Sequence, residues 1–150
     1  MWLAPALFAG RRGRRGGHTF RQRSILVVDD EPVVRALLTA ALEPTGSRLV
    51  EAVDGSEALE VAWREHPDLV LLDVGLPKLS GVDVCRALKT SPSPPHVILI
   101  TGDALAQDID ACGADSVIAK PFRPVDLVDE VERALERVAG GQRAEAGAGG

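Results

Sequence analysis

Short, fully apolar runs recur along the chain and alternate with segments that have the spacing of an amphipathic helix. Residues 25–28 and 69–72 contain only large aliphatic side chains, which is typical of strands that are covered on both faces. Similar but weaker signals predict further strands at residues 48–53, 96–101 and 116–120, and helices at residues 32–42, 54–63, 79–89, 103–112 and 124–138. Five strands that alternate with five helices predict right-handed βαβ units. The expected fold is therefore α/β, a doubly wound five-stranded parallel sheet with helices on both faces.

Charge is distributed unevenly along the chain. Residues 1–28 contain six arginines and no acid, whereas the remainder holds 11 basic and 22 acidic side chains. An acidic body disfavours DNA binding, which depends mainly on the neutralisation of phosphates. Clustered acids suit a divalent cation instead. We therefore expect no direct DNA binding by the folded domain.

Composition divides the chain into three parts. We expect a basic extension at residues 1–23, a folded domain at residues 24–138 and a Gly/Ala-rich tail at residues 139–150, with both ends disordered. The apolar start of the extension precedes its arginines, which is the reverse of a secretory signal peptide, and it is too short to span a bilayer. The extension has two alternative interpretations: a basic arm that touches anionic surfaces, or an over-long start without a function. The tail is too short for a DNA-binding helix-turn-helix, so we expect a stand-alone domain.

The two cysteines, Cys85 and Cys112, lie inside apparently regular segments and form neither a CxxC pair nor a metal-binding spacing. Buried free thiols are typical of a reducing compartment, so we expect a cytoplasmic protein.

Acidic, hydroxyl or amino side chains lie at the ends of four of the five predicted strands. Asp29 and Asp30 end the first strand, Asp73 the third, Thr101 the fourth and Lys120 the fifth. Each alone has an ordinary structural explanation, such as a helix cap, a turn or a solvated surface charge. In a doubly wound sheet, however, ligands bind beyond the carboxyl ends of the strands. We therefore expect these side chains to meet at one edge of the sheet.

Three neighbouring carboxylates repel one another by several kcal/mol at an effective dielectric of about 20, unless a cation shares them. Mg²⁺ fits, because it takes few carboxylates and keeps several waters in its octahedral shell. A lysine ammonium could pair with a phosphoryl oxygen, a threonine hydroxyl could donate to a second oxygen, and an aspartate carboxylate can be the nucleophile. The set therefore predicts a phosphoryl-transfer site.

Four stretches carry a resemblance to a known family: "VVDDEP", "LVLLDVGLPKLSG", "ILITGD" and "GADSVIAKPF". In this order and with these separations, the chain resembles a response-regulator receiver domain over residues 24–138, with a flavodoxin-like (βα)5 fold. The resemblance implies that Asp73 accepts a phosphoryl group from a histidine kinase or a histidine phosphotransfer protein. It also implies that Asp29 and Asp30 bind Mg²⁺ together with Asp73 and the backbone carbonyl of Gly75.

The same resemblance implies the roles of two further residues. Lys120 matches the phosphate-binding lysine, and its peptide bond to Pro121 is usually cis in the family. Thr101 matches the hydroxyl that turns toward the phosphoryl group.

Three departures from the family pattern concern the relay of the signal. Val117 occupies the position of the family's aromatic switch residue, and the chain has no tyrosine. Lys120 follows Thr101 after 19 positions, about one helical turn fewer than is common in the family, so the helix at residues 103–112 or its loop is expected to be short. Gly75 leaves the site without a side chain where many relatives have one.

The function we expect is that of a single-domain response regulator that is phosphorylated at Asp73 and binds an unidentified downstream protein. It would be a monomer or weak homodimer, and not an enzyme, beyond Mg²⁺-dependent self-phosphorylation and self-dephosphorylation. The first alternative is a receiver-like scaffold or adaptor whose function does not depend on phosphorylation. A phosphatase with an aspartate nucleophile fits less well, because its acids would form a DxD pair on the first strand. A nucleotide- or flavin-binding module fits least, because no Gly-rich phosphate loop follows that strand.

Overall fold

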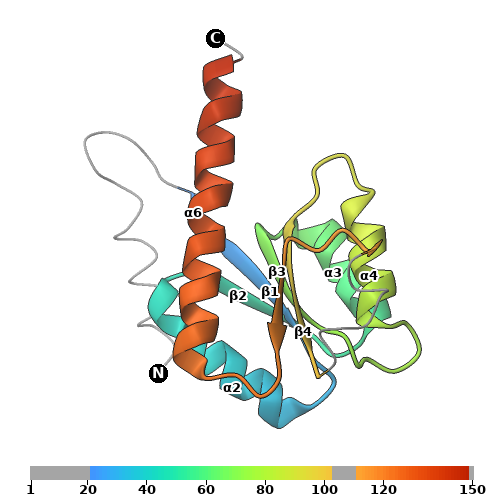
Figure 1. The fold of residues 1–150 in the computed structure, drawn as a ribbon. Helices are drawn as coiled ribbons and strands as arrows, with labels where there is room; N and C mark the ends of the chain where they lie inside the picture. The colour runs from blue at the N-terminus through green and yellow to red at the C-terminus, as the bar shows by residue number, and fades with distance from the viewer. Residues whose placement is uncertain (1–20, 103–110, 149–150) are drawn as a thin grey trace.

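A computed structural model describes residues 21–102 and 111–148, which form a five-stranded parallel sheet with helices on both faces (Figure 1). The strands are β1 (Ser24–Val28), β2 (Arg48–Ala52), β3 (Leu69–Asp73), β4 (His96–Thr101) and β5 (Ser116–Ala119). The helices are α2 (Pro32–Leu42), α3 (Gly55–Glu65), α4 (Gly81–Lys89) and α6 (Pro124–Ala148), and a 3-10 turn, η1 (Glu43–Thr45), follows α2. The strand order β2-β1-β3-β4-β5 confirms the predicted doubly wound topology.

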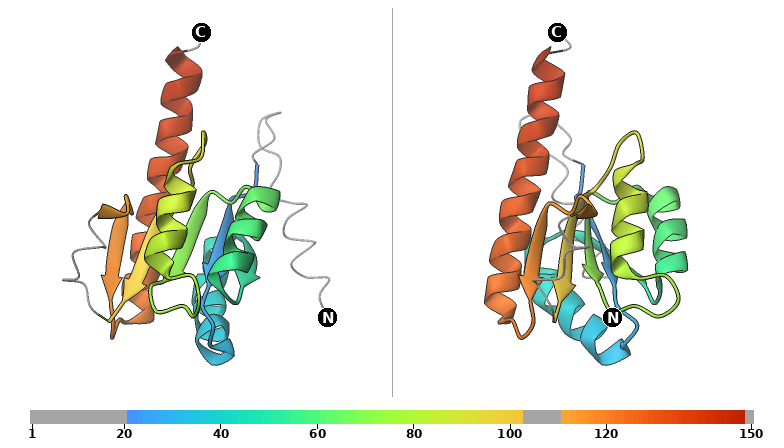
Figure 2. Two further views of the ribbon diagram at one scale, coloured as in Figure 1. Left: turned by 90° about the vertical axis from the view of Figure 1, so that its right-hand side faces the viewer. Right: turned by 45° about the vertical axis from the view of Figure 1, so that its right-hand side comes forward.

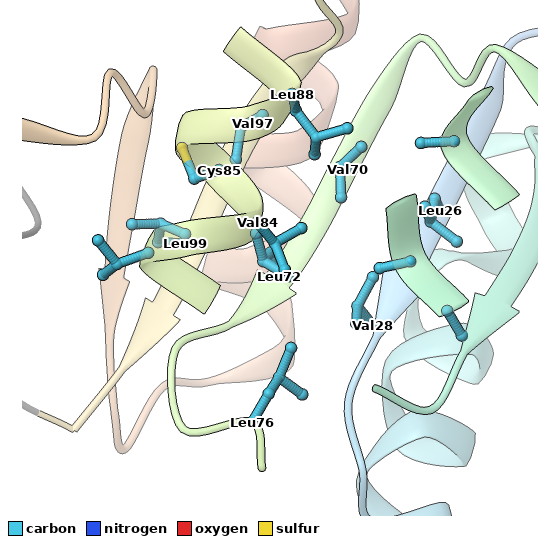
Figure 3. Packing of buried hydrophobic residues seen from close by; sticks show 14 of the residues in the cluster. Leu26, Val28, Val70, Leu72, Leu76, Val84, Cys85, Leu88, Val97 and Leu99 are labelled. Carbon is cyan, nitrogen blue, oxygen red and sulfur yellow. The ribbon is translucent and has the colours of Figure 1, made fainter. Parts of the chain in front are cut away.

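Alternate side chains of the central strands enter two separate cores. Leu26 and Leu72 belong to the core beneath α3 and α4, which Figure 3 shows from close by, whereas Ile25 and Leu71 belong to the core beneath α2 and α6. Figure 2 shows the two pairs of helices on opposite faces of the sheet. Because both faces are covered, these strands are apolar throughout, and this is why their sequence predicted them.

The helix starts follow the capping signals in the sequence. Asp54 accepts a hydrogen bond from the N–H of Glu57 at 2.8 Å before α3, and the Ser80 hydroxyl accepts one from the N–H of Asp83 at 3.2 Å before α4. Pro32 is the first residue of α2, where a missing N–H costs nothing. These caps satisfy N–H groups that have no partner inside the helix.

The chain departs from expectation at α6, which continues to Ala148 instead of ending at Val138. The predicted tail is rich in alanine and also contains glutamine, arginine and glutamate, all good helix formers, so a helix extends through it despite its glycines.

The turn η1 was not predicted. Most of the helix predicted at residues 103–112, and most of the predicted basic extension, lie outside the described residues. None of the described helices is long and apolar enough to cross a membrane.

Two glycines allow the segment after β3 to lie close to its neighbours. A Cβ atom at Gly81 would lie 2.3 Å from the carbonyl oxygen of Asp73, and one at Gly55 would lie 2.6 Å from the carbonyl oxygen of Leu79. Both obstacles are backbone atoms, which cannot move aside as a flexible side chain could. The start of α4 is therefore packed directly against the strand end that carries Asp73.

We predict that Gly81→Ala lowers the free energy of unfolding by about 1–3 kcal/mol, because the added methyl group forces backbone atoms apart. Urea unfolding followed by circular dichroism measures the change. Gly140→Ala is the matched control, since a Cβ atom there meets nothing within 4 Å. It should be neutral or stabilise α6, by up to about 1 kcal/mol. Equal effects of the two substitutions would contradict the packing described here.

Candidate functional site

The acid pair directly follows β1, beyond the carboxyl end of the strand. The N–H of Asp29 donates to the carbonyl of Ala52 on β2 at 3.3 Å, and the Asp29 side chain accepts from the N–H of Glu31 at 2.9 Å. Asp29 is buried whereas Asp30 is exposed. One acid is therefore held rigidly by backbone hydrogen bonds, while its neighbour faces solvent.

Arg35 on α2 holds the same segment from the helix side. Its guanidinium donates to the backbone carbonyl of Asp29 at 2.7 Å and forms an ion pair with Glu51 on β2 at 3.1 Å. Arg35 was not predicted as a site residue, because an arginine on an amphipathic helix usually faces water. The available signal was its distance along the chain: a helix that starts at Pro32 must keep its first turns beside the acid pair.

Asp73 ends β3, the neighbour of β1 in the sheet, and its side chain is buried. Its Oδ1 atom lies 2.9 Å from the Nζ atom of Lys120, with which it forms an ion pair. Lys120 directly follows β5, and its N–H donates to the carbonyl of Thr101 at 2.8 Å. The peptide bond between Lys120 and Pro121 is cis, as the resemblance implied.

The three acids converge as the sequence predicted. One carboxylate oxygen from each of Asp29, Asp30 and Asp73 lies within 4.8 Å of the other two. Lys120 brings one positive charge to this group, so a negative charge remains for a cation to share. The donor set consists of hard oxygen atoms, which are the ligands that Mg²⁺ prefers.

The surroundings change the proton affinities of two of these groups. Burial raises the pKa of Asp29, and the nearby charges of Asp73 and Asp30 raise it further, against the opposing effects of the Glu31 N–H and of Lys120. For Lys120, burial acts to lower the pKa, but the hydrogen bond and charge of Asp73, aided by Asp29 and Glu31, outweigh burial and leave this pKa raised. Lys120 is therefore firmly cationic, and burial together with the nearby like charges disfavours the ionised form of Asp29.

The remaining predicted residues lie around this cluster. Thr101 is buried at the end of β4. A Cβ atom at Gly75 would lie 3.7 Å from Oδ2 of Asp73, so the backbone of Gly75 passes beside the carboxylate. Val117 is 38% exposed on β5, where it pairs with Leu99. The short helix predicted between Thr101 and Lys120 lies mainly outside the described residues.

Comparison with known proteins identifies the family. The family model for the response regulator receiver domain matches residues 25–132. The chain belongs to the response-regulator receiver family. Its receiver domain therefore spans the sheet, the acid cluster and Lys120.

Curated relatives of this receiver domain are response regulators. The chain is 41% identical over 122 residues to the DNA-binding response regulator MtrA of Mycolicibacterium smegmatis, with 79% of this chain and 53% of the relative aligned. It is 39% identical over 120 residues to the alkaline phosphatase synthesis transcriptional regulatory protein PhoP of Bacillus subtilis, with 77% and 49% aligned. The chain thus spans about half the length of these relatives.

Solved receiver domains have the same fold. The signal receiver domain of a putative LuxO repressor protein from Vibrio parahaemolyticus matches with a TM-score of 0.77 at 26% identity, covering 83% of this chain and 98% of that one. The signal receiver domain of a signal transduction histidine kinase from Syntrophus aciditrophicus matches with a TM-score of 0.72 at 36% identity, covering 77% and 92%. The described chain is thus a receiver domain of two-component signalling.

Proposed function

We propose that this receiver domain accepts a phosphoryl group on Asp73 from the phosphohistidine of a sensor histidine kinase or a histidine phosphotransfer protein. The observation that carries the proposal is the ion pair between Lys120 and Asp73, 2.9 Å long, beside the two acids that follow β1. A buried carboxylate with a cation at hydrogen-bond distance and spare negative charge around it suits phosphoryl transfer better than a structural role.

In the proposed step, a carboxylate oxygen of Asp73 attacks phosphorus and the bond between phosphorus and the donor imidazole nitrogen breaks. The electron pair of that bond stays on the imidazole, and an acyl phosphate forms on Asp73. Lys120 exchanges its contact with Asp73 for a phosphoryl oxygen, and the hydroxyl of Thr101 donates to another. The positions of both groups support these roles. Thr101 ends β4, which is next to β3 in the sheet, and Lys120 follows β5 and is hydrogen-bonded through its N–H to Thr101.

Mg²⁺ is the cofactor we propose for the acid cluster. Its ligands would be the carboxylates of Asp29, Asp30 and Asp73 and the backbone carbonyl of Gly75, with water in the remaining positions. When bound, the ion would neutralise charge that develops on the transferring phosphoryl oxygens.

An exposed apolar stripe on α2 supports a protein as the phosphoryl donor. Val33 is 80% exposed and Leu37 is 51% exposed, and they lie one helical turn apart beside the acid pair. On its opposite face, α2 buries Leu38 and Leu42 in the core, so the outward stripe is not needed for folding. We propose that the donor protein packs on this stripe, which brings its phosphohistidine to Asp73.

Beyond phosphorylation, the proposed output is the binding of a downstream protein, by a monomer or weak homodimer. We propose that the domain is no enzyme toward separate substrates and does not bind DNA itself, because its body is acidic. The alternative is a scaffold that works without phosphorylation, and Val117 at the switch position favours it. We propose a cytoplasmic location, which accords with the absence of a disulfide between the buried Cys85 and Cys112.

We predict that Asp73→Asn abolishes Mg²⁺-dependent phosphorylation, because an amide oxygen is a poor nucleophile. Incubation with acetyl phosphate followed by intact-mass measurement should show one added phosphoryl mass on the unchanged chain and none on the variant. Asp68→Asn is a control, since this buried acid precedes β3 at the opposite end of the strand. Labelling of Asp73→Asn would move the acceptor elsewhere, and no labelling of the unchanged chain would favour the scaffold.

We predict that Asp30→Asn weakens Mg²⁺ binding by about tenfold or more, because one of three converging charges is lost. Isothermal titration calorimetry measures the affinity directly, without any phosphoryl donor. Glu31→Gln is the matched control, since this adjacent acid lies outside the converging set. The proposed site fails if Asp30→Asn binds Mg²⁺ as tightly as the control does.

We predict that Leu37→Ser lowers kcat/KM for phosphotransfer from a histidine-phosphorylated protein by about 5- to 30-fold, the cost of one central apolar contact. Labelling by acetyl phosphate should stay unchanged, because the acid cluster is intact. Trp63→Ser, which removes an exposed apolar side chain from α3, is the control for loss of surface hydrophobicity. Equal loss with both donors would show that α2 supports the site rather than the partner.

A further inference from the structure

A cavity of about 640 Å³ lies at the end of the sheet opposite to the acid cluster. Asp68, which directly precedes β3, is part of its wall, whereas Asp73 ends the same strand. The other walls come from the end of α3, the loop that joins α4 to β4, and Val138 on α6. Figure 1 shows this loop and the strand ends that carry the acids at opposite ends of the molecule. A partner in this cavity would leave the phosphoryl-transfer site open.

The cavity walls are largely apolar and stiff. Trp63 on the last turns of α3 is 57% exposed, although tryptophan is a large apolar side chain. The loop of residues 91–95 contributes three prolines to the cavity wall, and Pro67 adds a fourth. Proline has a fixed φ angle, so such a wall loses little conformational entropy when it is covered. The size and composition are those of a binding site.

Arg21 ties the preceding chain to this cavity. It lines the cavity and forms an ion pair with Asp68, whose carboxylate also accepts a hydrogen bond from the N–H of Ser24 at 2.9 Å. Because Arg21 is the first described residue, the 20 residues before it leave from the rim of the cavity.

Those 20 residues contain an apolar run to which the proposed function assigns no role. Trp2, Leu3, Leu7 and Phe8 lie within seven positions, and four arginines follow at positions 11, 12, 14 and 15. The 13 residues from Phe8 to Arg21 span up to about 45 Å when extended, and about 20 Å on average as a flexible coil. The apolar run therefore reaches the cavity without strain.

We propose that residues 2–8 bind in the cavity beside Trp63, in the same molecule. The tether gives this segment an effective concentration in the millimolar range, so a weak affinity is sufficient. The arginines that follow are complementary to the excess of acid in the chain from Asp29 onward. The extension would then be an intramolecular ligand that covers the apolar walls of the cavity.

Acrylamide quenching of Trp63 tests the proposal on the full chain. Trp2→Phe keeps an aromatic group at position 2 and leaves Trp63 as the single tryptophan. In this background we compare the chain with a variant that carries Leu3→Ser, Leu7→Ser and Phe8→Ser. Because the bound segment would cover much of the exposed indole, the serine variant should be quenched about twofold more strongly.

Ala4→Ser, Ala6→Ser and Ala9→Ser form the matched control, since they alter the same segment without removing its large side chains. This control should be quenched like the Trp2→Phe chain. Far-UV circular dichroism of all three proteins verifies that the domain is folded. Equal quenching of the Trp2→Phe chain and the serine variant would overturn the proposal. Protection that appears only at higher protein concentration would also overturn it, in favour of a second copy in the cavity.

Discussion

Mutual repulsion among three carboxylates is the constraint on which the rest of the site depends. Asp29, Asp30 and Asp73 are held within 4.8 Å by the ends of two adjacent strands, and Lys120 offsets only part of their charge. Such crowding costs folding free energy, so a rigid frame stabilised elsewhere must offset the repulsion. Here the frame is the pairing of β1 with β3 between two apolar cores. The site thus owes its geometry to strands that contain almost no polar side chain.

Three of the supporting contacts act on the backbone rather than on the carboxylates. Arg35 donates to the carbonyl of Asp29, and Lys120 donates its N–H to the carbonyl of Thr101. Gly81 lets α4 pack against the carbonyl of Asp73. Each contact leaves carboxylate oxygen atoms available to a cation or a phosphoryl group. A preorganised frame with available ligands is what phosphoryl transfer requires, because little covalent chemistry is left for the protein to perform.

Sequence patterns predicted most of the fold and the members of the acid cluster. The apolar runs identified β1 and β3, and the topology of parallel strands placed their terminal acids together. The contacts of Arg35 and the close approach at Gly81 were not predicted, because both depend on how a helix is oriented against a strand end. The continuation of α6 to Ala148 was missed for another reason. The glycines of the tail led to a prediction of disorder, whereas the alanines between them favour a helix.

The two faces of α2 differ in what they contact. Leu38 and Leu42 hold the helix in the core and Arg35 secures the acid pair, while Val33 and Leu37 point outward. The outward positions lie outside both the buried core and the acid cluster. If the phosphoryl donor packs on this stripe as proposed, a few substitutions on one helix are enough to give copies of the domain separate donors after gene duplication. Parallel signalling routes would then become insulated from one another with the acid cluster unchanged.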